Sequence, residues 1–440
     1  MKPHRSLLPK NTPSRKGVPP PFPGRIVYFS PVPDDASLNP FRTLQRHRNF
    51  RLFWFGQTLS LIGTWMQTMA QGWLALELSN SAFLVGLVAS AQSFPILVFS
   101  LHAGVFVDRT DKLRLVKIAQ TLLALEAAAL WWFTWSGHIT VGWLLVLATI
   151  NGLVTAFEIP ARQSLIIELV GRDDLPGAIA LNSSGFNIAR VVGPSIGAVI
   201  IAKAGLSWCF GVNAFSYVTV LIGLFLIRLP AWTAPEHLAS PLEGIREGVR
   251  YMRDTPSISA LMRFVAVYSI LGVPYLTLMP VVARDQLGLG AGGYGALLAC
   301  VGIGGVTGAL TLAAVGDRIR RTQLLSYASY VFATLLIAFS LVRDASLAYP
   351  ILLGVGFTMI LNNAVANSTL QHLVPNELRG RLMAAYSFIV VGMSQVLGSV
   401  LAGSIAHAIG VSWSIGGAAA VMLAYAYWAF ERRPELRAVQ

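Results

Sequence analysis

Few side chains in this chain are arranged for covalent chemistry. His102, His138 and His407 lie far apart, and their spacing matches no metal site. The two cysteines, Cys209 and Cys300, fall in separate apolar runs, which favours two small buried side chains over a disulfide or a redox pair. We therefore expect no enzyme active site, no bound metal and no cofactor.

Two charged residues isolated in apolar runs could carry chemistry of another kind. Glu126 lies about 11 residues into its run and Arg190 about 13 into its own, or roughly 16 and 20 Å along a helix. A charge is costly in such surroundings, so each is a candidate for binding cargo or for coupling to an ion. An ion pair between them is one interpretation. The alternatives are a protonated or locally hydrogen-bonded carboxyl for Glu126 and a static partner for Arg190.

A charged pattern occurs twice, in segments 104–114 and 313–321. Each has Asp-Arg at the start of a short basic stretch between long apolar runs, and the two Asp-Arg pairs lie 209 residues apart. Recurrence at the same place in both halves of a chain indicates an internal repeat. The positions that we single out in these segments are Gly104, Asp108, Arg109, Lys112, Asp317, Arg318 and Arg321.

The elements that must position these residues are long apolar helices. The chain is 55% hydrophobic and only 12% charged, whereas soluble domains carry about 25% charged residues. Its apolar runs divide into twelve candidate spans, each near the ~20 residues that a bilayer core requires. They cover roughly 51–77, 82–106, 115–135, 140–161, 177–203, 207–229, 258–282, 292–314, 322–341, 346–369, 382–406 and 411–430.

The distribution of basic residues orients these spans. With the N-terminus inside, 29 of the 33 Lys and Arg fall on the inner side, three on the outer side and one within a span. This is a strong positive-inside signal, so we expect a multi-pass protein of the cell (inner) membrane with both termini in the cytoplasm. The net charge of +13 is explained by orientation and by contact with anionic membrane lipid, and we expect no nucleic-acid partner.

The spans and the segments between them predict five regions. Residues 1–40 contain ten prolines and no apolar run, which is typical of a disordered segment. In the central linker, apolar residues at 242, 245, 249 and 252 predict a short helix that lies on the membrane surface. The regions are a disordered, Pro-rich, basic cytoplasmic tail (1–47), a six-helix bundle (48–229), the linker (230–257), a second six-helix bundle (258–431) and a cytoplasmic tail (432–440).

Polar residues form a stripe along the first span. Gln57, Ser60, Thr64, Gln67 and Gln71 follow a spacing of three to four, so they share one helix face. Lipid disfavours such a stripe, which must face a cavity or another helix. Later spans add Asn362, Asn363, Tyr386 and Gln395 to the candidates for contact with cargo or for coupling. A cavity lined in this way suits a moderately large amphipathic molecule, and the alternative is hydrogen bonding between helices.

The repeated loops resemble those of the major facilitator superfamily, in which a Gly-x-x-x-Asp-Arg-x-x-Arg/Lys segment joins helices 2 and 3 and a degraded copy joins helices 8 and 9. The second copy here has Ala313 in place of the leading glycine. Span 5 resembles the exporter motif of this superfamily, with Ala198 in place of its last glycine. The motif residues permit close helix packing and a kink, and they are Gly185, Gly193, Pro194 and Gly197. An ordinary packing face is the alternative.

Further stretches narrow the resemblance to the transmembrane secretion effector group. They are residues 158–164, 180–183, 187–190 and 375–381. The resemblance implies an all-α membrane protein with twelve transmembrane helices in two six-helix repeats, the major facilitator fold. It also implies that a monomer exports a small organic molecule, such as a siderophore, drug or metabolite, by alternating access in exchange for protons. Span 4 has no basic residue before Arg162, where many proton-coupled members carry an arginine. An importer and a non-transporting scaffold of a secretion system remain alternatives.

Glu158 and Arg162 lie one helical turn apart, so they share a face. The resemblance places them beside the Asp108 loop. We interpret Asp108, Arg109, Lys112, Glu158 and Arg162 as a charge network that closes the cytoplasmic side when the outer side opens. The alternative is that these charges only order the loop and fix the topology.

Overall fold

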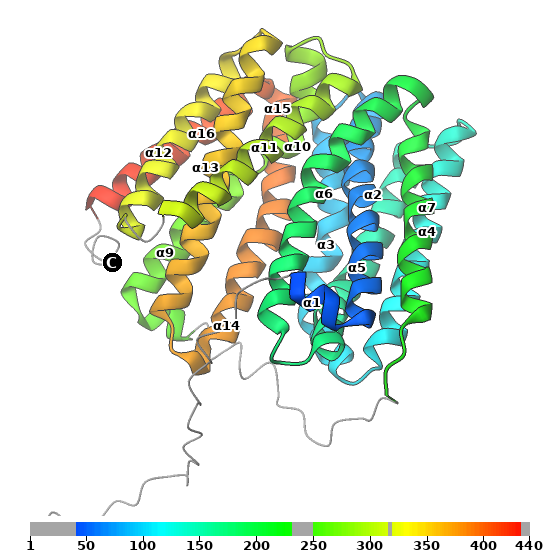
Figure 1. The fold of residues 1–440 in the computed structure, drawn as a ribbon. Helices are drawn as coiled ribbons and strands as arrows, with labels where there is room; N and C mark the ends of the chain where they lie inside the picture. Colours follow the sequence, from blue (N-terminus) through cyan, green and yellow to red (C-terminus); the bar gives the residue numbers. More distant parts are fainter. Residues whose placement is uncertain (1–40, 231–249, 316–318, 433–440) are drawn as a thin grey trace, which may run out of the picture. The chain divides into compact units, whose positions relative to one another are not determined.

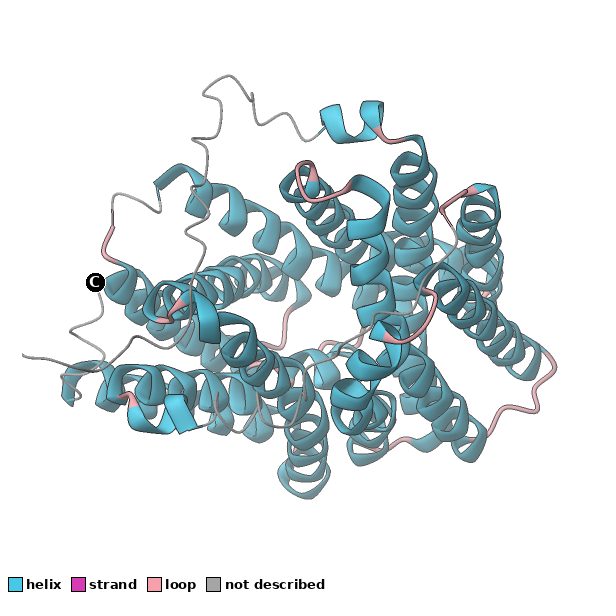
Figure 2. Ribbon diagram, turned by 90° about the horizontal axis from the view of Figure 1, so that it is seen from below, coloured by secondary structure: helices cyan, strands magenta, loops and turns pink. Residues whose placement is uncertain are grey.

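A computed structural model describes residues 41–230, 250–315 and 319–432 of the chain. The described residues form helices joined by short turns and contain no strand (Figure 2). The repeated pair Asp317 and Arg318 lies outside the described residues, as do positions 242, 245 and 249 of the predicted surface helix.

The first half consists of a short helix and six long ones, which run from blue to green in Figure 1. They are α1 (Phe41–Arg46), α2 (Arg48–Ser79), α3 (Ala82–Asp108), α4 (Lys112–Trp135), α5 (Val141–Val170), α6 (Leu175–Ala204) and α7 (Ser207–Leu226).

The second half repeats this arrangement with two of its six long helices built from several segments. They are α9 (Pro256–Val267), η1 (Tyr268–Gly272), α10 (Tyr275–Val281) and η2 (Val282–Gln286), then α11 (Ala291–Val315), α12 (Arg321–Leu341) and α13 (Ala345–Leu373), then α14 (Asn376–Ser387), η4 (Phe388–Gly398) and α15 (Ser399–Ile409), and finally α16 (Val411–Arg432).

These helices account for the twelve predicted spans. Ten are long and apolar enough to cross a bilayer by length and composition. The other two, α2 and α4, have 32 and 24 residues and carry the polar stripe and Glu126. Their glutamines and Glu126 are buried against neighbouring helices, which removes the cost of exposing these side chains to lipid.

Local signals fix several helix ends. The side chains of Ser81, Asp111 and Thr140 accept hydrogen bonds from the backbone N–H three residues later and begin α3, α4 and α5. Asn80 ends α2 in the left-handed conformation, which asparagine tolerates better than other non-glycine residues. The turns between spans are therefore short, as a bundle of antiparallel helices requires.

The helices of each half pack in the same order. In the first half α2 contacts α6 and α7, and α4 contacts α5 and α7; in the second, α12 contacts α13 and α16. Across the halves, α6 packs against α11, and α3 packs against η4 and α15. We call the end with the Asp108–Arg109 turn the inner end and the end with Asn80 the outer end.

The helix α1 corrects one prediction. The disordered tail was expected to extend to residue 47, but residues 41–46 are helical. Thr43 and Leu44 are buried, and the side chains of Arg46 and His47 bind Asp174 at 3.2 and 2.7 Å. The ion pair and the two buried side chains dock this segment on the bundle.

Candidate functional site

Glu126 lies at the centre of a buried amide network in the first half. Its side chain comes from α4, and the residue is 3% exposed. Gln67 of α2 donates its Nε2–H to the two carboxyl oxygens at 3.3 and 3.1 Å, and Asn151 of α5 donates its Nδ2–H to Oε2 at 3.0 Å. Among the described residues no basic side chain pairs with Glu126. The possible ion pair with Arg190 is therefore not formed.

The network extends beyond these three residues in two directions. Asn213 of α7 donates to the Gln67 Oε1 at 2.8 Å, and Gln92 of α3 donates to the Asn151 Oδ1 at 3.0 Å. Every amide thus donates toward Glu126, which is the polarity that stabilises an ionised carboxylate. A protonated Glu126 would need an acceptor, so taking up a proton would require some amides to turn over.

A second carboxyl, Glu158 of α5, lies closer to the inner end. Its Oε1 accepts hydrogen bonds from Arg162 Nε at 2.8 Å and from Gln120 Nε2 at 3.0 Å. Gln120 also donates to the Gln57 Oε1 at 3.3 Å, which ties α2, α4 and α5 together. Glu158 and Arg162, which the spacing placed on one helix face, form an ion pair.

The second half has a neutral version of this contact. Ser329 lies 209 residues after Gln120, the same separation as between the two Asp-Arg pairs. It donates to the Oδ1 of Asn362 at 2.6 Å, and Asn362 donates to the Thr358 carbonyl at 3.0 Å. The repeat is therefore visible in side-chain contacts as well as in helix order.

The polar stripe of α2 faces other helices of its own half. Gln57 and Gln67 belong to the two networks above, and Thr64 Oγ1 donates to the Ser60 carbonyl at 3.0 Å and lies 3.4 Å from the Tyr217 hydroxyl. Gln71 differs, because it is 3% exposed and neither atom of its amide has a hydrogen-bond partner among the described residues. Of the two interpretations of the stripe, contact between helices holds for Gln57, Thr64 and Gln67.

Arg190 extends from α6 of the first half toward the second. Its Nη2 occupies the space beside Gly305 of α11, 2.7 Å from where a Cβ on that glycine would lie. The side chain is half-buried and has no ion pair or hydrogen bond with another described residue. A permanently charged guanidinium is thus available at the contact between the halves.

Glycines bring α6 close to two of its neighbours, α2 and α11. A Cβ at Gly193 would lie 2.7 Å from the Ile62 carbonyl oxygen of α2, and one at Gly197 would lie 2.8 Å from the Met69 side chain. Gly185 is likewise tight against Thr58. On the opposite side, a Cβ at Gly295 of α11 would lie 2.9 Å from the carbonyl oxygen of Pro194. The predicted packing role of this motif agrees with these contacts.

The charged positions at the inner end do not form one joined network. Asp108 and Arg109 are exposed, and neither side chain has an ion pair or hydrogen bond with another described residue. Lys112 Nζ lies 3.6 Å from Glu168 Oε1 instead of pairing with Asp108. A Cβ added at Gly104 would have no neighbour within 4 Å. Arg321, in the second copy of the pattern, is half-buried at the start of α12. In this conformation the expected network is reduced to its Glu158–Arg162 pair.

Three candidates lie in the inner and middle parts of the second half. Tyr386 of α14 donates its hydroxyl to the carbonyl oxygen of Asn363 at 3.3 Å, which joins α14 to α13. The Asn363 and Gln395 side chains are half-buried. Unlike Asn362, they are not held in a buried side-chain pair, so they remain available for contact with cargo.

Sequence reasoning missed the partners that define the network. Gln92, Gln120, Asn151 and Asn213 were not singled out, because each is a single amide in an apolar run. Gln92 and Asn151 are 59 residues apart, and Gln67 and Asn213 are 146 apart. A usable signal would have been that every amide in the middle of spans 2, 3, 4 and 6 needs a partner.

Comparisons with known proteins agree on one family. The family model described as "Transmembrane secretion effector" matches residues 36–439. The multidrug efflux pump Tap of Mycolicibacterium fortuitum is 28% identical over 79% of this chain and 87% of its own length. The staphyloferrin A transporter of Staphylococcus aureus is 24% identical over 88% of this chain and 97% of its own.

The fold is also that of solved transporters. A bacterial homologue of the human lysosomal transporter Spinster, in an inward-facing and unoccupied conformation, superposes with a TM-score of 0.71 at 14% identity. The match covers 89% of this chain and 97% of that structure.

Proposed function

We propose that this chain exports a small organic molecule by alternating access. It belongs to the transmembrane secretion effector family of the major facilitator fold, and it is therefore a multi-pass membrane transporter and not an enzyme. The inner end would face the cytoplasm of a cell whose inner membrane holds the protein, and the outer end would face away from it. Relatives that pump drugs or carry a siderophore support small amphipathic molecules as cargo.

The observation that carries this proposal is the way in which the two halves meet. Their described contacts lie in the outer and middle parts of the bundle and depend on glycine. Gly86 of α3 faces the carbonyl oxygen of Ser399. A Cβ added at Gly403 of α15 would lie 2.8 Å from the carbonyl oxygen of Ala82. Surfaces with few side chains can rock without large rotamer changes. At the inner end, exposed Asp108 and Arg109 are free to form new contacts when that end closes.

We propose that Glu126 carries the proton of an antiport cycle. It is a buried carboxyl whose amide donors can reverse, and Gln92 links it to α3, one of the helices that contact the second half. A change of protonation at Glu126 would therefore change hydrogen bonds at the helix that moves. Arg190, with Asn363, Tyr386 and Gln395, is our candidate set for contact with cargo.

Inside-out membrane vesicles test the export direction and its coupling together. With an acidic interior, the wild-type protein should accumulate labelled cargo, and collapse of the pH gradient should stop this accumulation. A Glu126→Gln variant should lose accumulation but keep cargo-for-cargo exchange, because a neutral side chain still permits the conformational change. An importer would accumulate no cargo in these vesicles under this gradient, and a scaffold would show neither accumulation nor exchange.

The gating role of the inner loop has a separate test. An Asp108→Asn change should slow transport while leaving membrane insertion intact, since it removes a charge that closes the inner end. The rate of exchange in vesicles, normalised to the amount of inserted protein, measures this. An unchanged rate would remove Asp108 from the proposed gate.

A further inference from the structure

An alternating transporter needs a contact that holds its outer end closed while the inner end is open. We propose that Arg284 is this outer latch, because it joins the second half to Asn80 and the Leu76 carbonyl of the first. This inference rests on the proposed function, since a latch has a role only if the halves move.

A single side chain of the outer latch joins the two halves. Arg284 lies in η2, at the outer end of its span, and its Nη1 donates to Asn80 Oδ1 at 2.8 Å and to the Leu76 carbonyl oxygen at 3.4 Å. On its other side, Nε donates to Asp285 Oδ1 at 2.6 Å and Nη2 to Oδ2 at 3.4 Å. Asp285 thus holds the guanidinium in place while Nη1 reaches the opposite half.

The end of α2 is shaped to receive this arginine. Asn80 has φ 48° and ψ 30°, and it is the one residue other than glycine with a positive φ in the described part of the chain. Its own N–H donates to the Leu76 carbonyl oxygen at 2.8 Å, which closes the helix. The side-chain oxygen of Asn80 is therefore not used for the cap and can accept from Arg284.

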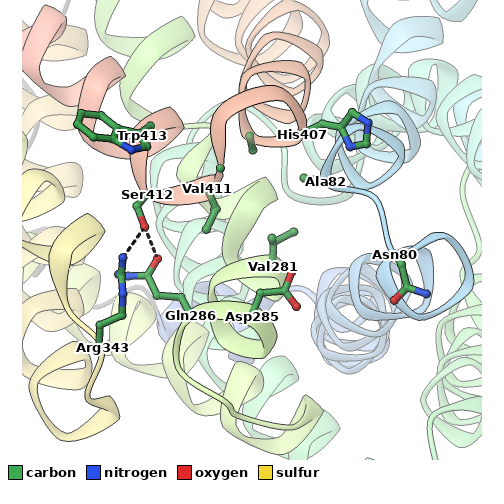
Figure 3. A pocket seen from close by; sticks show the side chains of 12 residues that line it. Asn80, Ala82, Val281, Asp285, Gln286, Arg343, His407, Val411, Ser412 and Trp413 are labelled. Carbon is green, nitrogen blue, oxygen red and sulfur yellow. Dashed lines mark hydrogen bonds between the residues drawn. The ribbon is translucent and has the colours of Figure 1, made fainter.

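A second contact between the halves lies about two helical turns from Asn80 along α2. The rings of Trp73 in α2 and Tyr294 in α11 stack with their centres 5.9 Å apart. An outer pocket of about 470 Å³ borders the latch and is shared by the halves (Figure 3). The first half supplies Asn80 and Ala82, and the second supplies residues that include Asp285, His407 and Trp413.

The exposure of the latch suits a contact that must open in each cycle. The Arg284 side chain is 28% exposed and that of Asp285 is 46% exposed, so solvent weakens their electrostatic attraction. The hydrogen bond to Asn80 is charge-assisted and specific in direction, which favours the closed arrangement without making it permanent.

Arg343 provides a matched control on the same rim. Its guanidinium donates to the carbonyl oxygens of Ser340 and Val342 and to the Ser412 hydroxyl, all in the second half. Figure 3 shows Arg343 and Ser412 across the outer pocket from Asn80. Loss of Arg343 removes the same charge from the same rim and leaves contacts between the halves intact.

The test measures the opening of the outer end directly. Spin labels at His138 and Ser346, at the outer ends of different halves, report their separation by double electron–electron resonance in lipid nanodiscs. Arg284→Gln and Asn80→Gly should each raise the population of the longer, open distance about tenfold, the effect of losing one charge-assisted hydrogen bond. Glycine keeps the left-handed backbone of residue 80, so Asn80→Gly removes only the acceptor. Arg343→Gln should leave the distribution as in the wild type.

The double variant completes the test. If the two residues act through one contact, Arg284→Gln with Asn80→Gly should open the outer end no further than either change alone. The latch is overturned if both single variants give the same distance distribution as Arg343→Gln. It is also overturned if the double variant raises the open population by the product of the two single effects. Cargo transport by the wild-type protein in vesicles is measured in parallel. Absence of transport would rule out the proposed function. Transport by the wild-type protein, combined with unaltered distances in the Arg284 and Asn80 variants, would rule out the latch alone.

Discussion

Hydrogen bonding divides the polar residues of α2 into two kinds. Gln67 connects Glu126 to Asn213, so both ends of its amide are used. Gln71, one turn further toward the outer end, is equally buried but has no partner among the described residues. Two residues that look alike in the sequence therefore contribute to stability with opposite sign.

Replacing each of these glutamines by leucine should separate the two cases. Gln67→Leu leaves Glu126 and Asn213 short of a partner and should lower the free energy of unfolding by about 2 kcal/mol. Gln71→Leu removes an unpartnered amide and should raise it by about 1 kcal/mol. Thermal unfolding in detergent, followed by native tryptophan fluorescence, measures both. A loss of stability in Gln71→Leu would mean that ordered water or cargo already satisfies this amide.

Arg190 calls for a prediction about cargo charge. Since its guanidinium has no acidic partner among the described residues, we expect Arg190→Ala to reduce transport of anionic cargo more than that of neutral cargo, by about tenfold for one lost charge-assisted contact. Competition between the two cargoes in vesicles provides the measurement. Equal losses would assign Arg190 a structural role at α11.

At the scale of elements, side chains connect segments that the chain order does not predict to touch. Asp174 binds α1 to the start of α6 through His47 and Arg46, and the Ser394 hydroxyl of η4 donates to the Ser269 carbonyl of η1 at 2.6 Å. The second contact joins the π-helical segments of two different spans. Wider turns of this kind free backbone groups and are common where helices bend.

The docking of α1 should depend on pH through Asp174. The hydrogen bond from His47, aided by the charge of Arg46, lowers the pKa of this carboxyl below its usual range. A lowered folded-state pKa contributes stability that is complete above the unfolded value of about 3.9 and is lost as the pH falls through the lower value. A spin label on exposed Gln45 should therefore become mobile only in strong acid, whereas in Asp174→Asn it should be mobile at neutral pH.

The sequence predicted the elements better than their contacts. Apolar run length gave all twelve spans, since a bilayer core requires about twenty residues per helix. The shared face of Glu158 and Arg162 followed from their spacing, whereas close packing at Gly193 and Gly197 was expected from residue type and from the resemblance. The outer latch did not, because Asn80 and Arg284 are 204 residues apart. No local signal marked η1 or η4, since their residues read as ordinary apolar helix.

For the whole molecule, the repeat is symmetric in its helices and asymmetric in its charges. Positions 209 residues after Gln120 and Glu126 are Ser329 and Leu335, and the position 204 residues after Arg190 is Ser394. At these three places the first half thus carries one amide and two charges, whereas the second half carries hydroxyls and one apolar side chain. This division supports a cycle in which one half responds to protonation and the other moves against it.

The contact between the halves can be tested with one methyl group. A Cβ at Gly86 would press on the Ser399 backbone, so Gly86→Ala should oppose closure of the outer end at a cost of about 1–3 kcal/mol and slow transport. Gly417 of α16 has open space around it, and Gly417→Ala should leave transport unchanged. Exchange rates in vesicles compare the two variants, and equal rates would contradict a tight interface at α3.

The neighbours of these glycines also determine which genetic suppressors are available. The atoms that an alanine at position 86 would meet belong to the backbone of Ser399 and Gly403, and no substitution can make a backbone smaller. Gly392 instead faces the side chain of Leu97, which a shorter residue could replace. Selection for restored transport should therefore return glycine itself at position 86, whereas damage at position 392 should be repaired by second-site changes at position 97.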